Sequence, residues 1–221
     1  MELNSVICGN ALEILQNWPE EVEIDAVVTD PPYGVQGGCG GQLLMKRKAD
    51  YGGGYFEDTP DYIADICVPI IQLCIKLFPV VVFTPGTRCM FSYPPPDDIG
   101  GFWSPAAPRL GRWGFSVFHP ILYYGKDWRA GKGPMPNSTT MNSRAPRNGH
   151  PCPKPLDAMQ WLVDKACKPG GTILDPFCGG GSILRAAQDE GRNYIGIDIN
   201  PVYCEITKKM TAQESLILTE E

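Results

Sequence analysis

A short apolar run that ends abruptly in prolines constrains the fold of this chain more than any other stretch. The run Ala26–Thr29 is followed at once by the tetrapeptide Asp30-Pro31-Pro32-Tyr33 and by Gly34. Such a run, bounded by prolines and a glycine, predicts a buried strand that stops at this point. The tetrapeptide therefore lies at the carboxyl end of a strand, which is where open α/β sheets bind their ligands.

The tetrapeptide offers three groups that suit one kind of ligand. Proline fixes φ and has no backbone donor, so the carbonyl group of Pro31 is rigid and free to accept a hydrogen bond. Together with the Asp30 carboxylate it can accept the two protons of an exocyclic amino group on a planar ring, while Tyr33 stacks on that ring. The alternative interpretation is an ordinary strand end at which Asp30 caps a turn.

Length and composition fit a single α/β domain over residues 1–221, because 43% hydrophobic content is enough for a sizeable core. No apolar run approaches the roughly 20 residues of a membrane span, and no amino-terminal signal is recognisable, so we expect a cytoplasmic protein. Nine cysteines without a C-x-x-C pair are expected to be reduced thiols. With two histidines and no paired cysteine spacing, we expect no metal site.

Positive charge is concentrated in one part of the chain. From 109 to 154 there are eight basic residues and a single acid, Asp127, although the whole chain has a net charge of −6. This asymmetry predicts a phosphate-contacting face on an acidic domain. A solvated loop region with a chance excess of bases is the alternative.

A long glycine-rich segment, from 35 to 58, follows the tetrapeptide and contains Lys46-Arg47-Lys48. A loop of this length inside a compact domain is usually functional or disordered. Because it lies directly behind the candidate site, we expect a mobile flap that closes over substrate. A merely disordered loop is a close alternative.

The remaining pattern predicts alternating strands and helices. The first half of the chain predicts a short strand at 6–8, a helix capped by Asn10, a strand over 23–29, a helix that begins at Thr59-Pro60 and a strand at 78–83. A mostly irregular stretch at 84–114 follows, then a strand at 115–124, whose Pro120 favours a sheet edge or bulge, and an exposed loop at 125–153. The rest predicts a helix from 155 to 166, a strand at 172–175, a helix through 187, a strand at 194–198 and a last helix capped at Asn200.

A glycine turn between two acids marks a second candidate site. Asp175 ends one predicted strand, Gly179-Gly180-Gly181-Ser182 follows, and Asp198 ends the next strand. In dinucleotide folds an acid about 20 residues on binds ribose hydroxyls. The turn departs from G-x-G-x-x-G, and its acid would repel a pyrophosphate, which disfavours a nicotinamide oxidoreductase. Both acids suit S-adenosylmethionine, which has an ammonium, a sulfonium and a ribose.

These motifs and their order resemble the amino-group DNA methyltransferases of the permuted (beta) class. Residues 30–34 are similar to the catalytic motif of that family, 175–182 to its cofactor loop, 196–201 to its acidic strand end, 150–155 to the segment before the loop and 8–12 to its opening segment. The resemblance implies an α/β, Rossmann-like S-adenosylmethionine-dependent methyltransferase fold. Its sheet is mostly parallel with helices on both faces, and its motif order is circularly permuted.

Two departures from the family pattern change what is expected of the cofactor site. Asn10 stands where the family commonly has Asp, and the triple glycine replaces the usual Gly-Ser-Gly-Thr, which predicts a more flexible loop. The family's recognition region falls between about 124 and 150 and is short. We therefore expect a short DNA-recognition insertion within about 84–150. Either its sequence selectivity is weak, or recognition borrows residues 84–114 and the 35–58 loop.

The resemblance implies a role for each motif residue. It assigns catalysis to Asp30, Pro31, Pro32 and Tyr33, and cofactor binding to Asn10, Asp30, Lys154, Asp175, Phe177, Gly179, Gly181, Ser182, Asp198 and Asn200. The basic residues expected to contact DNA are Lys46, Arg47, Lys48, Arg109, Arg112, Arg129, Lys132, Arg144 and Arg147.

The implied activity is methylation of an amino group on a base that is flipped out of the duplex or taken from single-stranded DNA. Asp at the first position of the tetrapeptide favours the 6-amino group of adenine over the 4-amino group of cytosine. The rival interpretations are a non-catalytic DNA-binding relative and methyltransferases of RNA bases or protein glutamine amides. A monomer or homodimer is expected, in a restriction system, a phage or a host regulatory role.

Overall fold

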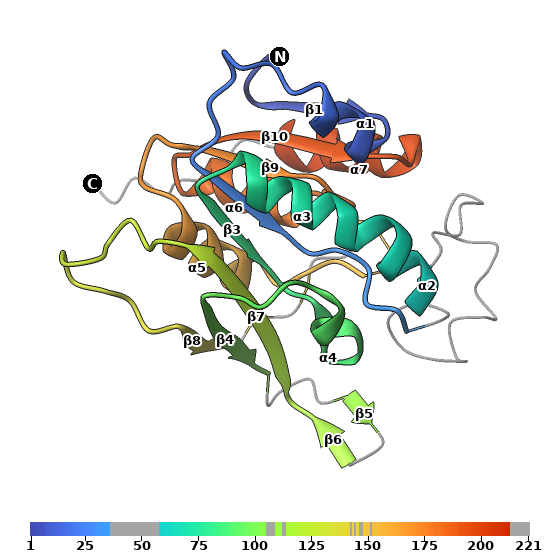
Figure 1. Cartoon of the computed structure of the whole chain (residues 1–221), viewed down its shortest axis with the longest axis vertical. Coiled ribbons are helices and arrows are strands. Elements are labelled where there is room, and N and C mark those ends of the chain that lie inside the picture. The colour runs from blue at the N-terminus through green and yellow to red at the C-terminus, as the bar shows by residue number, and fades with distance from the viewer. Residues whose placement is uncertain are drawn as a thin grey trace.

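The computed structural model describes residues 1–35, 58–104, 109–111, 114–141, 143, 145, 148–150 and 152–212. In this part of the chain an eight-stranded mixed sheet lies between two layers of helices, and a two-stranded hairpin projects from one end (Figure 1). The sheet contains β1 (Ser5–Cys8), β2 (Ala26–Thr29), β3 (Val80–Phe83), β4 (Asp98–Trp103), β7 (Phe118–Gly125), β8 (Ser138–Thr140), β9 (Thr172–Asp175) and β10 (Asn193–Asp198), and the hairpin contains β5 (Arg109–Gly111) and β6 (Gly114–Ser116).

Helices cover both faces of the sheet. In chain order they are α1 (Ala11–Gln16), α2 (Pro60–Tyr62), α3 (Val68–Leu77), the short α4 (Gly86–Cys89), α5 (Leu156–Ala166), α6 (Ser182–Asp189) and α7 (Pro201–Ala212). Val27 of β2 packs with α1 and α3 on one face, whereas Ala26 and Val28 pack with α5 and α6 on the other. Burial of both faces explains why β2 is continuously apolar.

The strand order is β1-β10-β9-β2-β3-β7-β4-β8. The strands from β1 to β3 are all parallel, and β7 runs antiparallel to both of its neighbours, β3 and β4. The expected α/β fold, with a mostly parallel sheet and helices on both faces, is therefore confirmed. The parallel arrangement places the carboxyl ends of β2, β9 and β10 at one edge of the sheet.

Helix starts follow the sequence signals. The side chain of Asn10 accepts a hydrogen bond from the Leu12 amide, and Thr59 accepts one from the Tyr62 amide at the start of α2. Between α2 and α3 the backbone widens into a π-helical turn, Ile63–Cys67, in which the Val68 amide donates to the Ile63 carbonyl. Pro69 lacks the next amide donor, which explains why the helix changes its hydrogen-bond pattern here.

Two expectations about residues 84–124 are wrong. The stretch expected to be irregular contains β4, and the strand containing Pro120 lies inside the sheet, not at its edge. Pro120 is tolerated because β3 pairs with β7 only from Leu122 onward, so one side of Pro120 has no strand beside it.

Two glycines explain why the sequence did not predict β4. A side chain at Gly100 would meet the carbonyl oxygen of Asn137, and one at Gly101 would meet the ring of Phe118. Close approach of the neighbouring strands therefore requires glycine, although glycine lowers strand propensity. The loop expected over 125–153 likewise contains a short strand, β8, which pairs in parallel with β4.

The described cysteines are mostly free thiols, as expected. The free ones are Cys8, Cys67, Cys74, Cys89, Cys167, Cys178 and Cys204. Cys152, in contrast, is disulfide-bonded, so the expectation of reduced thiols is wrong at that position. No described helix combines the length and apolar character needed to span a membrane.

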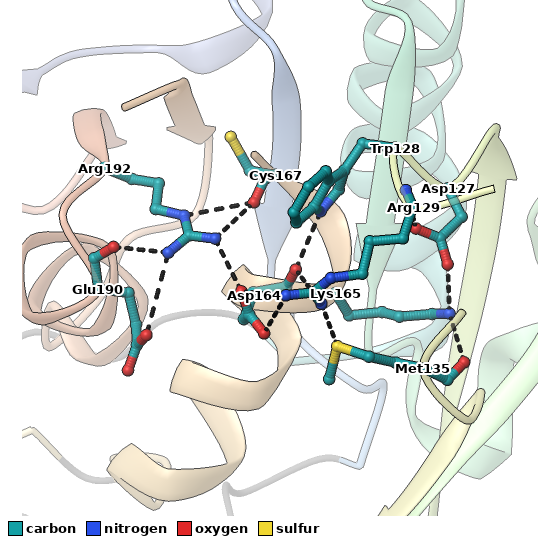
Figure 2. A network of polar contacts seen from close by, with 9 residues as sticks. All are labelled: Asp127, Trp128, Arg129, Met135, Asp164, Lys165, Cys167, Glu190 and Arg192. Carbon is teal, nitrogen blue, oxygen red and sulfur yellow. Dashed lines mark hydrogen bonds and ion pairs between the residues drawn. The ribbon is translucent and has the colours of Figure 1, made fainter. Parts of the chain in front are cut away.

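A cluster of charged side chains lies at the edge of the sheet opposite the tetrapeptide. The Asp164 carboxylate lies between two guanidinium groups, at 2.8 Å from the nearest nitrogen of Arg129 and of Arg192 (Figure 2). Arg192 has a side chain only 3% exposed and also donates to the Cys167 carbonyl. The Asp164 carbonyl accepts from the Trp128 indole. The cluster thus attaches the segment after β7 to the end of α5.

We predict that Asp164→Asn destabilises the protein. Removing this anion leaves the buried Arg192 with only Glu190 as a distant carboxylate partner, at 3.9 Å. The free energy of unfolding should fall by about 3 kcal/mol, because breaking a buried ion pair strands the remaining charge. Urea unfolding measures the change. Glu205→Gln, which breaks the exposed pair with Lys208, is the control and should leave the midpoint unchanged; equal effects of both variants would contradict the prediction.

Candidate functional site

The two sequence motifs meet because their strands are neighbours. β2 and β9 are paired in parallel, with Val27 opposite Leu174, so Asp30 and Asp175 follow adjacent strands at the same edge. The hydroxyl of Thr29 donates a 2.6 Å hydrogen bond to the Asp175 carboxylate. The end of β2 is thus joined directly to the end of β9.

One pocket at this edge contains most of the predicted site residues. It is lined by all four tetrapeptide residues and, of the predicted cofactor residues, by Asn10, Asp30, Lys154, Phe177, Gly179, Asp198 and Asn200. A smaller adjoining pocket is lined by Asp175 and Ser182 and shares Asp30 and Lys154 with the first. The catalytic and cofactor motifs therefore face a common space.

Asp30 is held by three side chains. One carboxylate oxygen accepts hydrogen bonds from the hydroxyls of Tyr33 and Thr84, and the other forms an ion pair with the ammonium group of Lys154. The Lys154 nitrogen also lies 4.6 Å from the centre of the Tyr33 ring. The resemblance implied that Lys154 binds the cofactor, and the structure pairs its charge with the Asp30 carboxylate.

The charges of this group depend on one another. Burial lowers the pKa of Lys154, but the adjacent Asp30 carboxylate more than offsets this, so the pKa is raised above its usual value. Burial, with the Asp30 charge, raises the pKa of the Tyr33 hydroxyl to about 12. At neutral pH the lysine is therefore a cation and the tyrosine a hydrogen-bond donor.

The tetrapeptide leaves its strand through a fixed turn. Gly34 has φ +70°, and a side chain there would meet the Cys89 sulfur. Its amide donates a 2.5 Å hydrogen bond to the buried carboxylate of Asp58. Asp58, which the sequence analysis did not select, thus fixes the backbone after the tetrapeptide. The flap predicted over 35–58 lies outside the described residues except for its two ends.

The triple glycine serves close packing. A side chain at Gly180 would lie 2.7 Å from the Cβ atom of His150, and one at Gly181 would meet Thr207 of α7. The Gly180 carbonyl accepts from the Asn148 side chain, and the Gly179 carbonyl accepts from the Thr207 hydroxyl. The turn is therefore covered by two other segments, which replaces the expectation of a flexible loop. Gly181, a predicted cofactor residue, faces α7.

Asp198 shapes the other side of the pocket. One of its carboxylate oxygens accepts from the Gly179 amide at 2.9 Å and the other from the Asn200 amide at 2.8 Å. Burial raises its pKa, although these two hydrogen bonds favour the carboxylate. Asn200 in turn accepts from the Val202 amide and so caps α7, while Asn10 caps α1. The polar ends of two helices are thus oriented around Asp198.

His150 completes the pocket and was quoted in the sequence only as part of a motif. Its ring packs edge-on against Tyr203 with centroids 4.6 Å apart. Burial and the nearby Lys154 charge lower its pKa to about 4, so the ring is neutral at pH 7. No signal in the sequence identified Tyr203, which lies one helical turn into α7.

The basic residues predicted to contact DNA separate into groups. Lys46, Arg47, Lys48, Arg112, Arg144 and Arg147 lie outside the described residues, and Arg109 begins β5. Arg129 and Lys132 follow β7, whose end at Gly125 pairs with Val80 at the start of β3. They therefore lie at the edge opposite the pocket, and Arg129 is bound to Asp164 (Figure 2). This place disfavours DNA contact by these two residues.

The acidic residues of the pocket suit a cationic ligand. Asp175 is buried and accepts hydrogen bonds from Thr29 and from the Phe177 amide, and no ion pair is formed with it among the described side chains. Burial raises the pKa of this carboxyl group to about 7, and the nearby charges of Asp30 and Asp198 add to the effect. A positively charged group in the pocket would compensate these acids.

Comparison with known proteins assigns the family. A family model described as DNA methylase, for N6 and N4 methyltransferases, matches residues 92–209. The chain belongs to this DNA methylase family. Its members transfer methyl groups from S-adenosylmethionine to amino groups of DNA bases, so the predicted family and cofactor are confirmed. The family does not distinguish adenine from cytosine as the target.

Individual DNA methylases are similar to this chain at low identity. The chain is 24% identical over 236 residues to the type II methyltransferase M.HpaI of Haemophilus parainfluenzae, covering 95% of this chain and 74% of that protein. It is 29% identical over 104 residues to M.XycI of Xanthomonas campestris pv. cyanopsidis, covering 43% of this chain and 35% of that protein. The second match therefore spans only about a third of its relative.

Solved structures confirm the fold of this DNA methylase. A crystal structure of an M1.HpyAVI–SAM complex has a TM-score of 0.65 at 19% identity and covers 95% of this chain and 99% of that chain. PvuII DNA methyltransferase, described as cytosine-N4-specific, has a TM-score of 0.64 at 17% identity and covers 98% of this chain and 89% of that chain. The circularly permuted motif order stays a prediction.

We predict that cofactor binding releases a proton from Asp175. With a pKa of about 7, this group is mostly protonated at pH 6, and a cationic ligand favours its ionised form. Affinity for S-adenosylmethionine should therefore rise with pH up to about pH 7. Titration calorimetry at pH 6, in two buffers of different ionisation enthalpy, should give different heats. Identical heats would contradict the prediction, and Asp175→Asn should abolish the difference.

Proposed function

We propose that this DNA methylase moves a methyl group from S-adenosylmethionine to the 6-amino group of adenine in DNA, as a single domain over residues 1–221. The observation that supports it best is the convergence of Asp30 with Asp175 and Asp198 on adjacent strand ends around two adjoining pockets. Asp30 supplies an acceptor for an amino group, and the other two acids suit the charge and ribose of the cofactor.

When bound, S-adenosylmethionine supplies an activated methyl group on its sulfonium. The residues of the chain position the base: the Asp30 carboxylate and the Pro31 carbonyl accept the amino protons and direct the nitrogen lone pair towards the methyl group. Positioning and electrostatics suffice, so no cysteine is needed as a nucleophile. Asp175 and Asp198 hold the cofactor opposite the tetrapeptide.

Lys154 must move for this chemistry to begin. Its ammonium group occupies the Asp30 oxygen that the substrate amino group needs, and it lies over the Tyr33 ring on which the base is proposed to stack. Before the base arrives, this cation forms an ion pair with the Asp30 carboxylate inside the pocket. Withdrawal of Lys154 then exposes a charged acceptor beside an aromatic face.

Cytosine methylation at the 4-amino group is the second candidate. The likeness of the fold to the cytosine-N4-specific PvuII enzyme over 98% of this chain favours it. The same tetrapeptide geometry serves both bases, because each presents an exocyclic amino group on a planar ring. Asp at the first tetrapeptide position remains our reason for placing adenine first.

DNA contact is proposed for most of the basic residues that the sequence singles out. β4, β7 and β8 are part of the main sheet, so the recognition insertion within 84–150 is reduced to the β5–β6 hairpin and the segments around it. Arg109 in this hairpin, with Lys46, Arg47, Lys48, Arg112, Arg144 and Arg147, remains our candidate set for phosphate contacts. Arg129 and Lys132 are left out of it because of their place at the opposite edge.

Methyl transfer tests the proposal directly. Labelled S-adenosylmethionine and mixed-sequence DNA should yield label in 6-methyladenine, and Asp30→Ala should lose at least about 100-fold in rate because the amino group loses its acceptor. Nucleoside analysis identifies the base. Label in 4-methylcytosine would support the second candidate, whereas no label despite cofactor binding would overturn the proposed activity.

A further inference from the structure

One aromatic side chain is exposed far more than the other large apolar ones in the described part of the chain. Phe91 is 89% exposed and lies in the 3₁₀ turn Met90–Ser92 after α4. Isolated apolar side chains are common on protein surfaces and need no explanation. Phe91 differs because of the elements that hold it and the edge on which it stands.

The segment before Phe91 is built onto the catalytic tetrapeptide. β3 runs parallel to β2 with Phe83 opposite Thr29, so the chain leaves β3 beside Asp30. Thr84 donates to the Asp30 carboxylate, and Gly86 lies so close to the Tyr33 ring that a side chain there would clash. Phe91 thus stands on the rim of the catalytic edge, a few residues from direct contacts with the tetrapeptide.

Buried residues anchor the turn on both sides of Phe91. Cys89 is 7% exposed and packs beside Gly34, and Tyr93 is 5% exposed with its ring 4.8 Å from that of Phe83. The backbone is therefore attached to the core immediately before and after the exposed ring. Arg88, three residues before Phe91, is also exposed and adds a positive charge to this segment. The result is an aromatic group attached firmly to the core, with a cation three positions away in the chain.

We propose that Phe91 enters the DNA duplex as a wedge and fills the space left by the flipped target base, while Arg88 contacts a flanking phosphate. The inference rests on the proposed function, because only an enzyme that acts on a flipped base leaves such a space. Unstacking a base costs a few kcal/mol, and an inserted apolar side chain replaces part of the lost stacking. Rigid mounting favours insertion because no loop must be ordered on binding.

The test compares Phe91→Ala with the wild-type protein on two forms of the same mixed-sequence DNA, native and heat-denatured. The variant should methylate duplex DNA at least about 10-fold more slowly, since base–aromatic stacking is lost, and denatured DNA at an unchanged rate, since no base need be flipped. Phe91→Trp should retain the duplex rate. Leu77→Ala, which removes a 41%-exposed apolar side chain at the end of α3 on the opposite edge, is the matched control and should change neither rate.

Each other outcome overturns the inference in a recognisable way. Equal duplex rates for Phe91→Ala and wild type exclude the wedge, and a proportionate loss on both DNA forms assigns Phe91 to the fold or the pocket. Absence of methyl transfer by the wild-type protein overturns the proposed function and this inference together. Arg88→Ala should weaken duplex binding and reduce its salt dependence, and an unchanged salt slope would remove Arg88 from the proposal.

Discussion

The pairing of β2 with β9 is the constraint on which the site depends. It places two acids that are far apart in the sequence on neighbouring strand ends, and the hydrogen bond from Thr29 to Asp175 joins them through a single side chain. Because both strands are buried on both faces, a one-residue slip would move every packed side chain to the opposite helix layer. The relative position of Asp30 and Asp175 is therefore set by the core of the sheet.

Two residues close together in the sequence reach different sides of the pocket. His150 covers the glycine turn, and four residues later Lys154 reaches Asp30. The first is a neutral ring at pH 7 and the second is a cation. The glycine turn and the tetrapeptide are therefore contacted by side chains only four positions apart in the chain.

Sequence reasoning predicted those features that depend on local chemistry. The strand ends at Asp30, Asp175 and Asp198, the caps at Asn10 and Thr59 and the glycine turn all have signals within a few residues, and the structure has each of them. It failed where distant strands decide the outcome. β4 was missed because its two glycines are required by close contacts with Asn137 and Phe118, which are distant in the sequence. Asp58 was missed because its hydrogen-bond partner, Gly34, belongs to another segment. The charge pattern grouped Arg129 and Lys132 with the other bases, since a count along the chain does not show that β7 leads them to the other edge.

The separation between the Asp164 cluster and the pocket has a consequence for engineering. Stability and activity usually compete when both depend on the same buried charges. In this protein an ion-pair cluster joins α5 to the segment after β7 at one edge of the sheet, whereas the acidic residues of the pocket lie at the other edge. Substitutions that strengthen the Asp164 cluster can therefore raise the melting temperature without changing residues of the pocket. This edge is the first place to look for a more thermostable variant of the enzyme.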